Sequence, residues 1–194
     1  DEALISERGF FTSLTHAEKI KLACGLFSKK DKPGKKFVYH STEIYILGTA
    51  LNNFIKSANS PNSDLYEDIM KPLWDNLSLS HALNKSQRTA DSINQTFTAW
   101  GLFFLSTDIV SIGNYLRNIA EENPQTLMGS SLQLNNKDRG LDAFSGIKFY
   151  NNGFWARKLP GFQVGCKQDV FIPYMEGYGG IVVALMPNGH LYYF

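Results

Sequence analysis

Apolar residues recur at steps of three and four along three stretches of the chain, a spacing that predicts amphipathic helices. Ser or Thr stands at the start of each stretch, and these side chains cap helix N-termini. The first start also fits a capping box, because Glu18 follows Thr15 by three residues. The predicted helices run from Thr15 to Phe27, from Ser41 or Thr42 to a stop before residues 57–62, and from Ser106 or Thr107 to Asn123-Pro124.

The pattern is weaker between the second and third helices. Asp64 can cap a short helix that reaches Met70, and Pro72-Leu73-Trp74 is then expected to turn the chain away. Residues 78–96 are polar and mixed, which predicts an irregular excursion over the surface.

Glycine, aromatic and β-branched residues become frequent after Gln125, and this composition predicts strands. Pro187-Asn188-Gly189 predicts a hairpin between the last two strands. The predicted strands are Ile147 to Lys158, Asp169 to Ile172, Gly180 to Met186 and His190 to Phe194.

Helices first and strands last predict an α+β fold, with a helical domain packed beside an antiparallel sheet. We expect residues 1–125 to form the helical part and residues 126–194 the strands, together one structural unit. The last predicted strand stops at Phe194 in mid-run, and a sheet made only of these strands has a bare edge. The chain is therefore expected to be incomplete at both ends.

Composition and charge narrow the function classes. The 194 residues are 43% hydrophobic, enough for a real core, and the formal net charge is only +1. No global field therefore attracts nucleic acid, and no window reaches the roughly 20 apolar residues of a membrane span. The one basic cluster surrounds a Pro-Gly turn and predicts a solvated loop rather than a phosphate site. Its members are Lys29, Lys30, Lys32, Lys35 and Lys36.

The cysteines and histidines do not show the spacing that is typical of metal ligands. Cys24 and Cys166 are the only cysteines, and the sequence leaves open whether they are thiols or a disulfide. The four histidines are scattered, so no metal site and no cofactor is predicted.

The candidate chemistry lies at Tyr39-His40-Ser41, where a loop is expected to enter the second helix. A tyrosine held near a cation can be driven toward phenolate and used as a general base. The alternative is that Tyr39 is an amphipathic aromatic residue that packs by its ring and leaves its hydroxyl in water.

Several segments, in the same order, resemble the serine β-lactamase and penicillin-binding-protein superfamily, and in particular its class C β-lactamase and esterase-like branch. The likeness covers about Ser13 to Phe194. The segments are Pro33-Gly34-Lys35-Lys36-Phe37-Val38-Tyr39-His40-Ser41, Ile46-Leu47-Gly48, Lys71-Pro72-Leu73-Trp74, Trp100-Gly101-Leu102-Phe103, Ser106-Thr107-Asp108-Ile109 and Gly177-Tyr178-Gly179-Gly180.

The resemblance implies an active site between a helical domain and a mainly antiparallel sheet. It also implies an acyl-enzyme mechanism, in which the Ser of an S-x-x-K motif attacks a carbonyl and Lys and Tyr carry the proton. Tyr39 corresponds to the family's motif Tyr, and Ser41 to a position that is usually Asn and helps to hold the substrate. Because a hydroxyl is shorter than an amide, Ser41 fills that role only in part.

Tyr178, Gly179 and Gly180 correspond to the family's third motif, which often contains a Lys. The lack of that cation here makes ester or amide cleavage a better expectation than β-lactam hydrolysis. Gly179 and Gly180 would permit close approach of substrate along an edge strand and leave an N–H for the oxyanion. The alternative is that residues 177–180 are only a flexible lead into a strand.

The nucleophile itself is missing, since residues 1–38 contain no S-x-x-K. Ser145-Gly146-Ile147-Lys148 fits the pattern, but it follows the Tyr motif and opens a predicted strand. Ser and Lys must lie one helical turn apart to face the same way, so we interpret this match as a coincidence.

Three functions remain open. The chain is the downstream portion of a serine hydrolase completed by another segment or chain, a catalytically inactive domain that binds a peptidoglycan fragment or partner, or a helical interaction module. The first predicts a small-molecule or peptidoglycan-like substrate and no activity of this chain alone. The family resemblance favours a periplasmic or secreted bacterial location. The third predicts that no pocket lies between Tyr39 and Tyr178.

Overall fold

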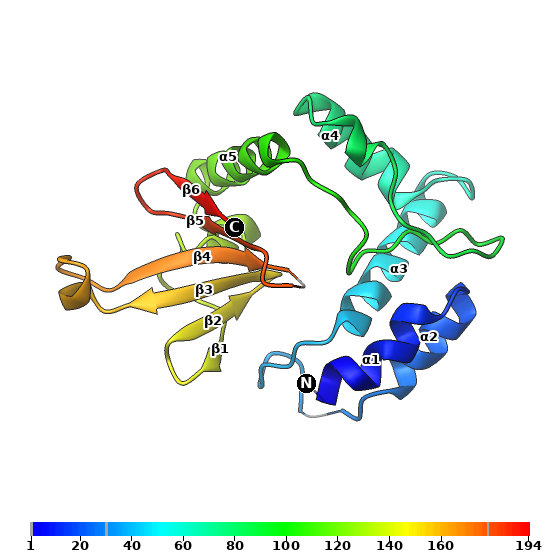
Figure 1. The fold of residues 1–194 in the computed structure, drawn as a ribbon, viewed down its shortest axis with the longest axis horizontal. Helices are drawn as coiled ribbons and strands as arrows, with labels where there is room; N and C mark the ends of the chain where they lie inside the picture. The colour runs from blue at the N-terminus through cyan, green and yellow to red at the C-terminus, as the bar shows by residue number, and fades with distance from the viewer. Residues whose placement is uncertain (1, 30, 178) are drawn as a thin grey trace. The chain divides into compact units, whose positions relative to one another are not determined.

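The computed structural model describes residues 2–29, 31–177 and 179–194, and the side chains from Glu7 onward within these ranges. Helices and one six-stranded antiparallel sheet make up the chain, which confirms the predicted α+β class (Figure 1). The chain divides into two compact units. Unit 1 contains Asp1–Lys30 and Val38–Asp108, and unit 2 contains Asp31–Phe37 and Ile109–Phe194.

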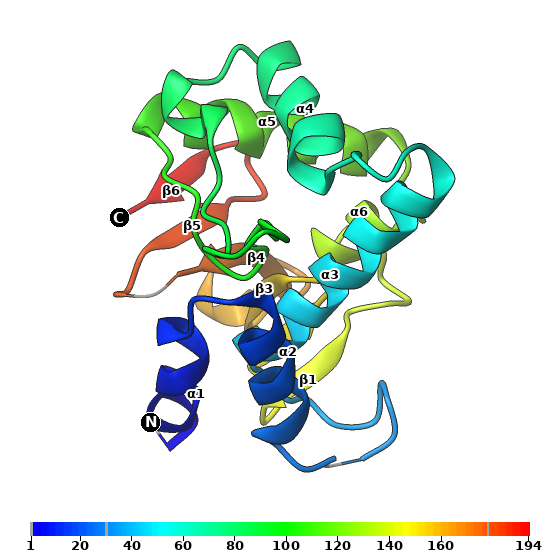
Figure 2. The ribbon, with the colours of Figure 1, turned by 90° about the vertical axis from the view of Figure 1, so that its right-hand side faces the viewer.

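Unit 1 is helical. Its first three helices contact one another (Figure 2), and the predicted capping box is present at Thr15. The structure also contains a helix before Thr15 that the sequence pattern did not predict. The elements are α1 (Glu2–Thr12), α2 (His16–Gly25), α3 (Ser41–Ala58), the π-helix η1 (Tyr66–Met70), α4 (Lys71–Asn76), the 3₁₀ helix η2 (His81–Asn84) and the start of α5 (Ser106–Glu122).

Two predictions in unit 1 need correction. The N-cap of the second predicted helix is His40, which makes no side-chain cap hydrogen bond, and not Ser41 or Thr42. Pro72 does not turn the chain away, because it lies in the first turn of α4, where a missing N–H costs nothing. Asp64 does cap the segment before α4, since it accepts hydrogen bonds from the backbone N–H groups of Tyr66 and Glu67.

The predicted surface excursion at 78–96 is irregular, apart from η2 and an isolated bridge between Arg88 and Thr96, but Leu83, Thr89, Gln95 and Thr96 in it are buried. Gln95 is 2% exposed and accepts a hydrogen bond from Asn52 Nδ2 at 3.0 Å. Asn52 Oδ1 in turn accepts one from the backbone N–H of Leu65 at 2.7 Å. Buried polar side chains therefore fix this segment against α3, because each unpaired group would cost free energy.

Lys19 of α2 is fully buried in unit 1. Its Nζ donates a hydrogen bond to the carbonyl of Phe10 at 2.7 Å, in the last turn of α1. The ammonium also lies 4.7 to 5.0 Å from the centroids of three rings, those of Phe10, Phe97 and Trp100. A cation at the C-terminal end of a helix meets the negative end of the macrodipole, so Lys19 joins α1 to α2.

Unit 2 contains the sheet, whose strand order follows the sequence from β1 to β6. All neighbouring strands are antiparallel. The elements are the rest of α5, α6 (Leu127–Ser131), β1 (Leu141–Phe144), β2 (Lys148–Asn151), β3 (Phe154–Leu159), the 3₁₀ helix η3 (Gly161–Gln163), β4 (Val170–Glu176), β5 (Val182–Leu185) and β6 (Leu191–Tyr193).

The strand predicted at Ile147 to Lys158 is wrong as one element. It is a hairpin, with β2 and β3 joined at Asn152-Gly153, whose φ values are 49° and 93°. Asn-Gly suits a two-residue turn of this kind because both positions need positive φ. The predicted hairpin at Pro187-Asn188-Gly189 is confirmed, whereas β1 and α6 were not predicted.

The core of unit 2 lies between α5, α6 and one face of the sheet. Ala120, Leu132 and Leu185 are at most 5% exposed and pack together, with Leu116 and Met128 against them. The observed division of the chain falls at Asp108, inside α5, whereas the composition changes at residue 125, after this helix ends.

Candidate functional site

Tyr39 and Ser41 both lie at the start of α3 in unit 1. Tyr39 lies in the loop just before the helix and is 50% exposed, and Ser41 is the first helical residue. The first N–H groups of an 18-residue helix carry a partial positive charge, which favours an anion nearby. Tyr39 therefore lies beside a helix end that favours an anion.

His40 fixes the loop between these two residues. Its ring stacks on the ring of Phe27, with 3.6 Å between centroids and 4° between planes. Its Nδ1 lies 3.5 Å from Oε1 of Glu43, one turn into α3. Aromatic stacking on one side and a carboxylate on the other leave the loop few alternative paths.

Glu7 of α1 is a residue of this junction that the sequence pattern did not reveal. Its Oε1 accepts a hydrogen bond from the backbone N–H of Thr42 at 3.3 Å, and the residue is only 4% exposed. A carboxylate at a helix N-terminus is favourable, and it also supplies negative charge beside the candidate site. No sequence signal pointed to it, because α1 itself was not predicted.

Gly179 and Gly180 lie in unit 2, in the turn that joins β4 to β5. The N–H of Gly177 donates to the carbonyl of Ile181 at 2.7 Å, which closes the turn. Gly179 and Gly180 have φ values of 85° and 87°, and a Cβ at either would meet nothing within 4 Å. Glycine is required here by the left-handed backbone rather than by close packing. Tyr178 lies outside the described residues.

The expectation of an edge strand at this turn is wrong. β5, which follows the turn, pairs with β4 on one side and with β6 on the other, so its backbone groups are engaged by neighbours. Any free N–H for an oxyanion must come from the turn itself and not from an unpaired strand.

The S-x-x-K match at Ser145 to Lys148 is not helical. Ser145 and Gly146 form the turn between β1 and β2, with φ values of 47° and 73°. Lys148 is the first residue of β2, and its Nζ lies 5.8 Å from the ring centroid of Trp155. The geometry that pairs Ser and Lys on one helical turn is therefore absent at this match.

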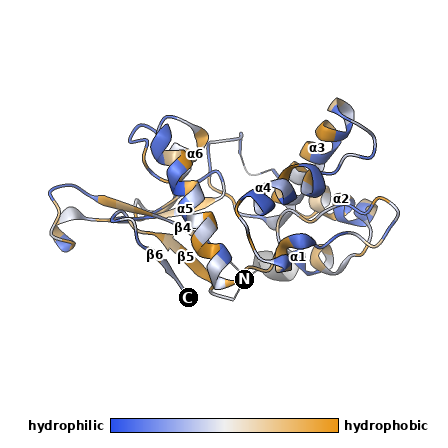
Figure 3. Cartoon of the chain, turned by 90° about the horizontal axis from the view of Figure 1, so that it is seen from above, coloured by the Kyte–Doolittle hydropathy of each residue, from blue (hydrophilic) through white to orange (hydrophobic). Residues whose placement is uncertain are grey.

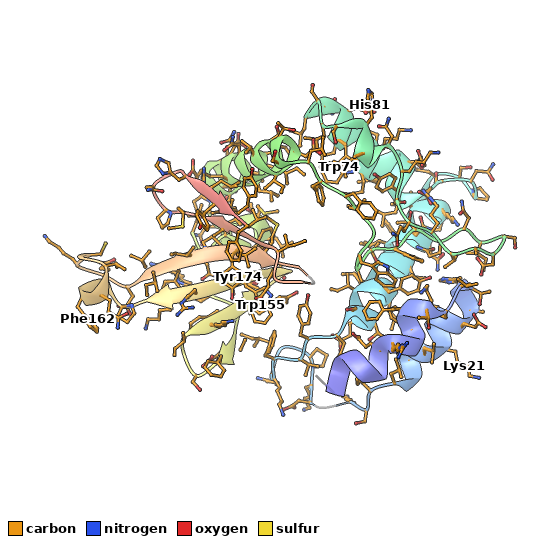
Figure 4. All side chains as sticks on the ribbon, viewed as in Figure 1. Lys21, Trp74, His81, Trp155, Phe162 and Tyr174 are labelled. Atoms are coloured by element: carbon orange, nitrogen blue, oxygen red, sulfur yellow. The ribbon has the colours of Figure 1, made fainter. Side chains whose placement is uncertain are left out.

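A row of aromatic rings crosses one face of the sheet in unit 2. Tyr150, Trp155 and Tyr174 occupy paired positions on β2, β3 and β4, and Trp155 and Tyr174 stack with 17° between planes (Figure 4). Phe37 lies 5.3 Å from the rings of both Tyr150 and Trp155. The basic loop before Phe37 is thus anchored to the sheet by this ring, while Lys32 and Lys35 are exposed, as a solvated loop predicts.

Cys24 and Cys166 are both free and exposed, which resolves the alternative left open by the sequence. Within the described residues, no three His, Cys, Asp or Glu side chains are arranged to hold a metal ion. In the same ranges, none of the helices has the length and apolar character that crossing a membrane requires.

Comparison of the chain with models of protein families, with curated proteins and with solved structures finds no match.

Proposed function

We propose that these residues are the downstream portion of a β-lactamase-like serine hydrolase, which cleaves ester, amide or D-amino-acid peptide bonds. The observation that carries the proposal is the junction at Tyr39, where an exposed phenol precedes the N-terminus of α3 and Ser41 opens the helix. This is the local arrangement that the resemblance implies for the proton-transfer tyrosine.

In the proposed reaction a serine hydroxyl, supplied by a segment other than those described, attacks the carbonyl carbon of the substrate. The serine proton passes through Tyr39 and a lysine to the leaving alcohol or amine, which departs as the acyl-enzyme ester forms. Water then attacks the ester, and its proton returns to the serine as the acid is released. Ser41 would orient the substrate by one hydrogen bond.

The turn geometry of Ser145 supports a nucleophile from outside the described residues, because a serine in a hairpin turn lacks the helical Lys partner. The same observation favours a second candidate, a catalytically inactive domain of this fold that binds peptidoglycan fragments without turnover.

The test uses a fluorophosphonate probe on the natural polypeptide in which these residues occur. We expect covalent labelling, and we expect Tyr39→Phe to slow it by about 100-fold or more, the usual contribution of a positioned proton-transfer group. Tyr192→Phe, at an exposed position in β6, is the matched control and should label at the wild-type rate. If the natural polypeptide does not label but does bind a peptidoglycan fragment, the hydrolase proposal is wrong and the inactive binding domain is the better proposal.

A further inference from the structure

A cavity of about 310 Å³ lies in unit 2, between the last turns of α5, the segment after α6 and the sheet. Figure 3 shows hydrophobic and hydrophilic residues alternating along α5, and Leu116 and Ala120 of this helix pack with Leu185 of β5. Every residue that lines the cavity belongs to unit 2, so its shape does not depend on where unit 1 lies. Sites for small molecules usually start at roughly 300 Å³, so the cavity is large enough for a small ligand.

The cavity lies on the face of the sheet opposite the aromatic row. Successive side chains of a strand point to opposite faces, so Phe171 and Pro173 of β4, which line the cavity, point away from the face of Tyr174. The cavity is at the end of the sheet where β4 begins and β5 ends, whereas the Gly179–Gly180 turn joins the other ends of these two strands. It is therefore separate from that turn, and the reaction proposed above does not involve it.

Arg139 is held in the wall of the cavity by neutral contacts. Its Nη1 donates a hydrogen bond to the carbonyl of Gln133, whose Nε2 donates in return to the carbonyl of Arg139 at 3.4 Å. Its Cζ lies 4.3 Å from the ring centroid of Phe171. Burial lowers the pKa of Arg139, because desolvation disfavours the charged guanidinium. An anion beside Arg139 would offset that cost, and most of the N–H donors of the guanidinium are left to bind one.

Arg117 of α5 gives the cavity a second guanidinium. Its Nη1 and Nη2 donate to two backbone carbonyls of the hairpin between β5 and β6, so this side chain is also fixed. Two carboxylates line the cavity as well, but Asp169 already pairs with Lys158 at 2.8 Å, and Glu121 is exposed. Among the described residues, neither guanidinium of the cavity forms an ion pair with a carboxylate. Both arginines therefore lack a counter-charge in this part of the chain.

We propose that this cavity binds a small organic acid. The carboxylate of the ligand accepts hydrogen bonds from the guanidiniums of Arg139 and Arg117, whose planar forks match its geometry. The apolar body of the ligand packs on the wall formed by Leu132, Phe171 and Pro173. An inorganic anion would leave this wall uncovered, and a neutral apolar ligand would leave the guanidiniums without a counter-charge. An anion with an apolar body satisfies both.

The probe is phenylacetate, which joins a carboxylate to an aromatic ring. It is titrated into the natural polypeptide in which these residues occur, with isotope-labelled arginine, and the side-chain resonances are followed by NMR. We expect the resonance of Arg139 to shift saturably, with a dissociation constant of about 1 mM or lower. Phenylacetamide, the neutral counterpart, and acetate, which has no ring, should bind about 10-fold more weakly, because each lacks one half of the recognition.

Arg139→Met removes the charge and keeps most of the stem, and it should weaken phenylacetate binding by about 10-fold or more. Arg157→Met is the matched control, because Arg157 is an exposed arginine of β3 on the face of Trp155, opposite the cavity. It should change the affinity by less than about two-fold, since a distant exposed charge is screened. Urea unfolding verifies that the variants are folded. Arg139→Lys keeps a cation, assigns the Arg139 resonance and replaces Arg139→Met if that variant does not fold.

Three outcomes would overturn the proposal. One is equal binding of phenylacetate and phenylacetamide, and another is an affinity that Arg139→Met leaves unchanged. The third is a shift of the Arg157 resonance as large as that of Arg139, which would mean that the anion binds arginines without selection. The reaction proposed above uses neither arginine, so these outcomes are independent of labelling by fluorophosphonate.

Discussion

The two units differ in the side chains that they bury. Unit 1 buries a charged residue, Lys19, and the amides of Asn52 and Gln95. Unit 2 buries aliphatic residues between α5, α6 and the sheet, and its strands are paired in register by backbone hydrogen bonds. Unit 2 buries polar side chains as well, such as Ser131 and Asn151, but the buried charged residues Glu7, Lys19 and Asp108 belong to unit 1.

The difference follows from how much of each unit is regular secondary structure. In a sheet the backbone groups pair with one another, and side chains have only to fill space. Unit 1 contains a long irregular segment, whose N–H and carbonyl groups need side-chain partners wherever they are buried. Asp64 illustrates this: burial would raise its pKa, but hydrogen bonds from Arg88 and from backbone N–H groups of η1 outweigh it and lower the pKa. The stability of unit 1 should therefore depend on hydrogen bonds, and that of unit 2 on packing.

The largest expected effect is in the packed unit. Leu185→Ala removes a 3%-exposed side chain from the core of unit 2 and leaves a cavity beside Ala120 and Leu132. We expect a loss of about 3–4 kcal/mol in the free energy of unfolding, measured by urea denaturation. Ile181→Ala, at a 57%-exposed position next to β5, should cost less than about 0.5 kcal/mol. Equal losses at the two positions would contradict a packed core here.

The second effect tests unit 1. Asn52→Ala removes the partner of two buried groups, Oε1 of Gln95 and the N–H of Leu65. Unsatisfied buried polar groups are costly, so we expect a loss of about 2–3 kcal/mol, although little apolar surface is removed. The exposed neighbour Asn53→Ala should be nearly neutral in the same urea titration. A loss at Asn52 no larger than that at Asn53 would remove the distinction between the units.

Sequence periodicity predicted the elements that carry their own signals. The helix after Thr15 has a capping box, and the helix after Ser41 has four apolar residues in phase. Such signals are local, and local chemistry decides them. The helix before Thr15 carries no comparable start signal, so it could not be predicted. The hairpin at Asn152-Gly153 does carry one, but the apolar residues on both sides of it continue the pattern of a single strand.

The candidate site was predictable only in part, for the same reason. Tyr39 and Ser41 are separated by one residue in sequence, and their place at a loop-to-helix junction follows from helix periodicity. The carboxylate of Glu7 comes from 35 residues away and depends on how α1 packs on α3. Periodicity predicts that the apolar side of α3 is buried. The buried side instead contains the polar residues Thr42 and Asn52, so the pattern did not identify it. Tertiary contacts overrode the pattern there.

Two glycines, one in each unit, test the same comparison with smaller expected losses of stability. In unit 1, a Cβ on Gly48 would lie 2.6 Å or less from three atoms of Thr98, including its own Cβ. In unit 2, a Cβ on Gly113 of α5 would meet chiefly the far end of the Leu191 side chain. Because a side-chain end moves more easily than a Cβ, we expect Gly48→Ala to cost about 1–2 kcal/mol in urea unfolding.

Gly113→Ala is the counterpart, and it should change stability by less than about 1 kcal/mol, since alanine also favours the helix. The opposite order of the two variants would mean that Thr98 yields freely and that the loop at 98 is not fixed against α3.

The smallest expected effect is a change of the unfolding free energy with pH, and it concerns Lys19. Burial lowers the pKa of Lys19 below 10.5, while the nearby Glu18 acts to raise it. Between the lowered folded pKa and 10.5, the folded state holds fewer protons than the unfolded state, so stability rises with pH. Lys19→Met keeps most of the stem and removes this contribution. The unfolding free energy of the wild type minus that of Lys19→Met should therefore increase toward pH 10.

Urea titrations at pH 7, 8, 9 and 10 measure this difference, because groups shared by both proteins cancel. Lys21→Met, at an exposed position of the same helix, is the control for removing an ammonium from α2. A constant difference for Lys19→Met across this range would contradict a buried cation between α1 and α2. The polar core of unit 1 would then depend on its amide network alone, and α1 would be held by the contacts of Phe10 with Tyr45 and Trp100.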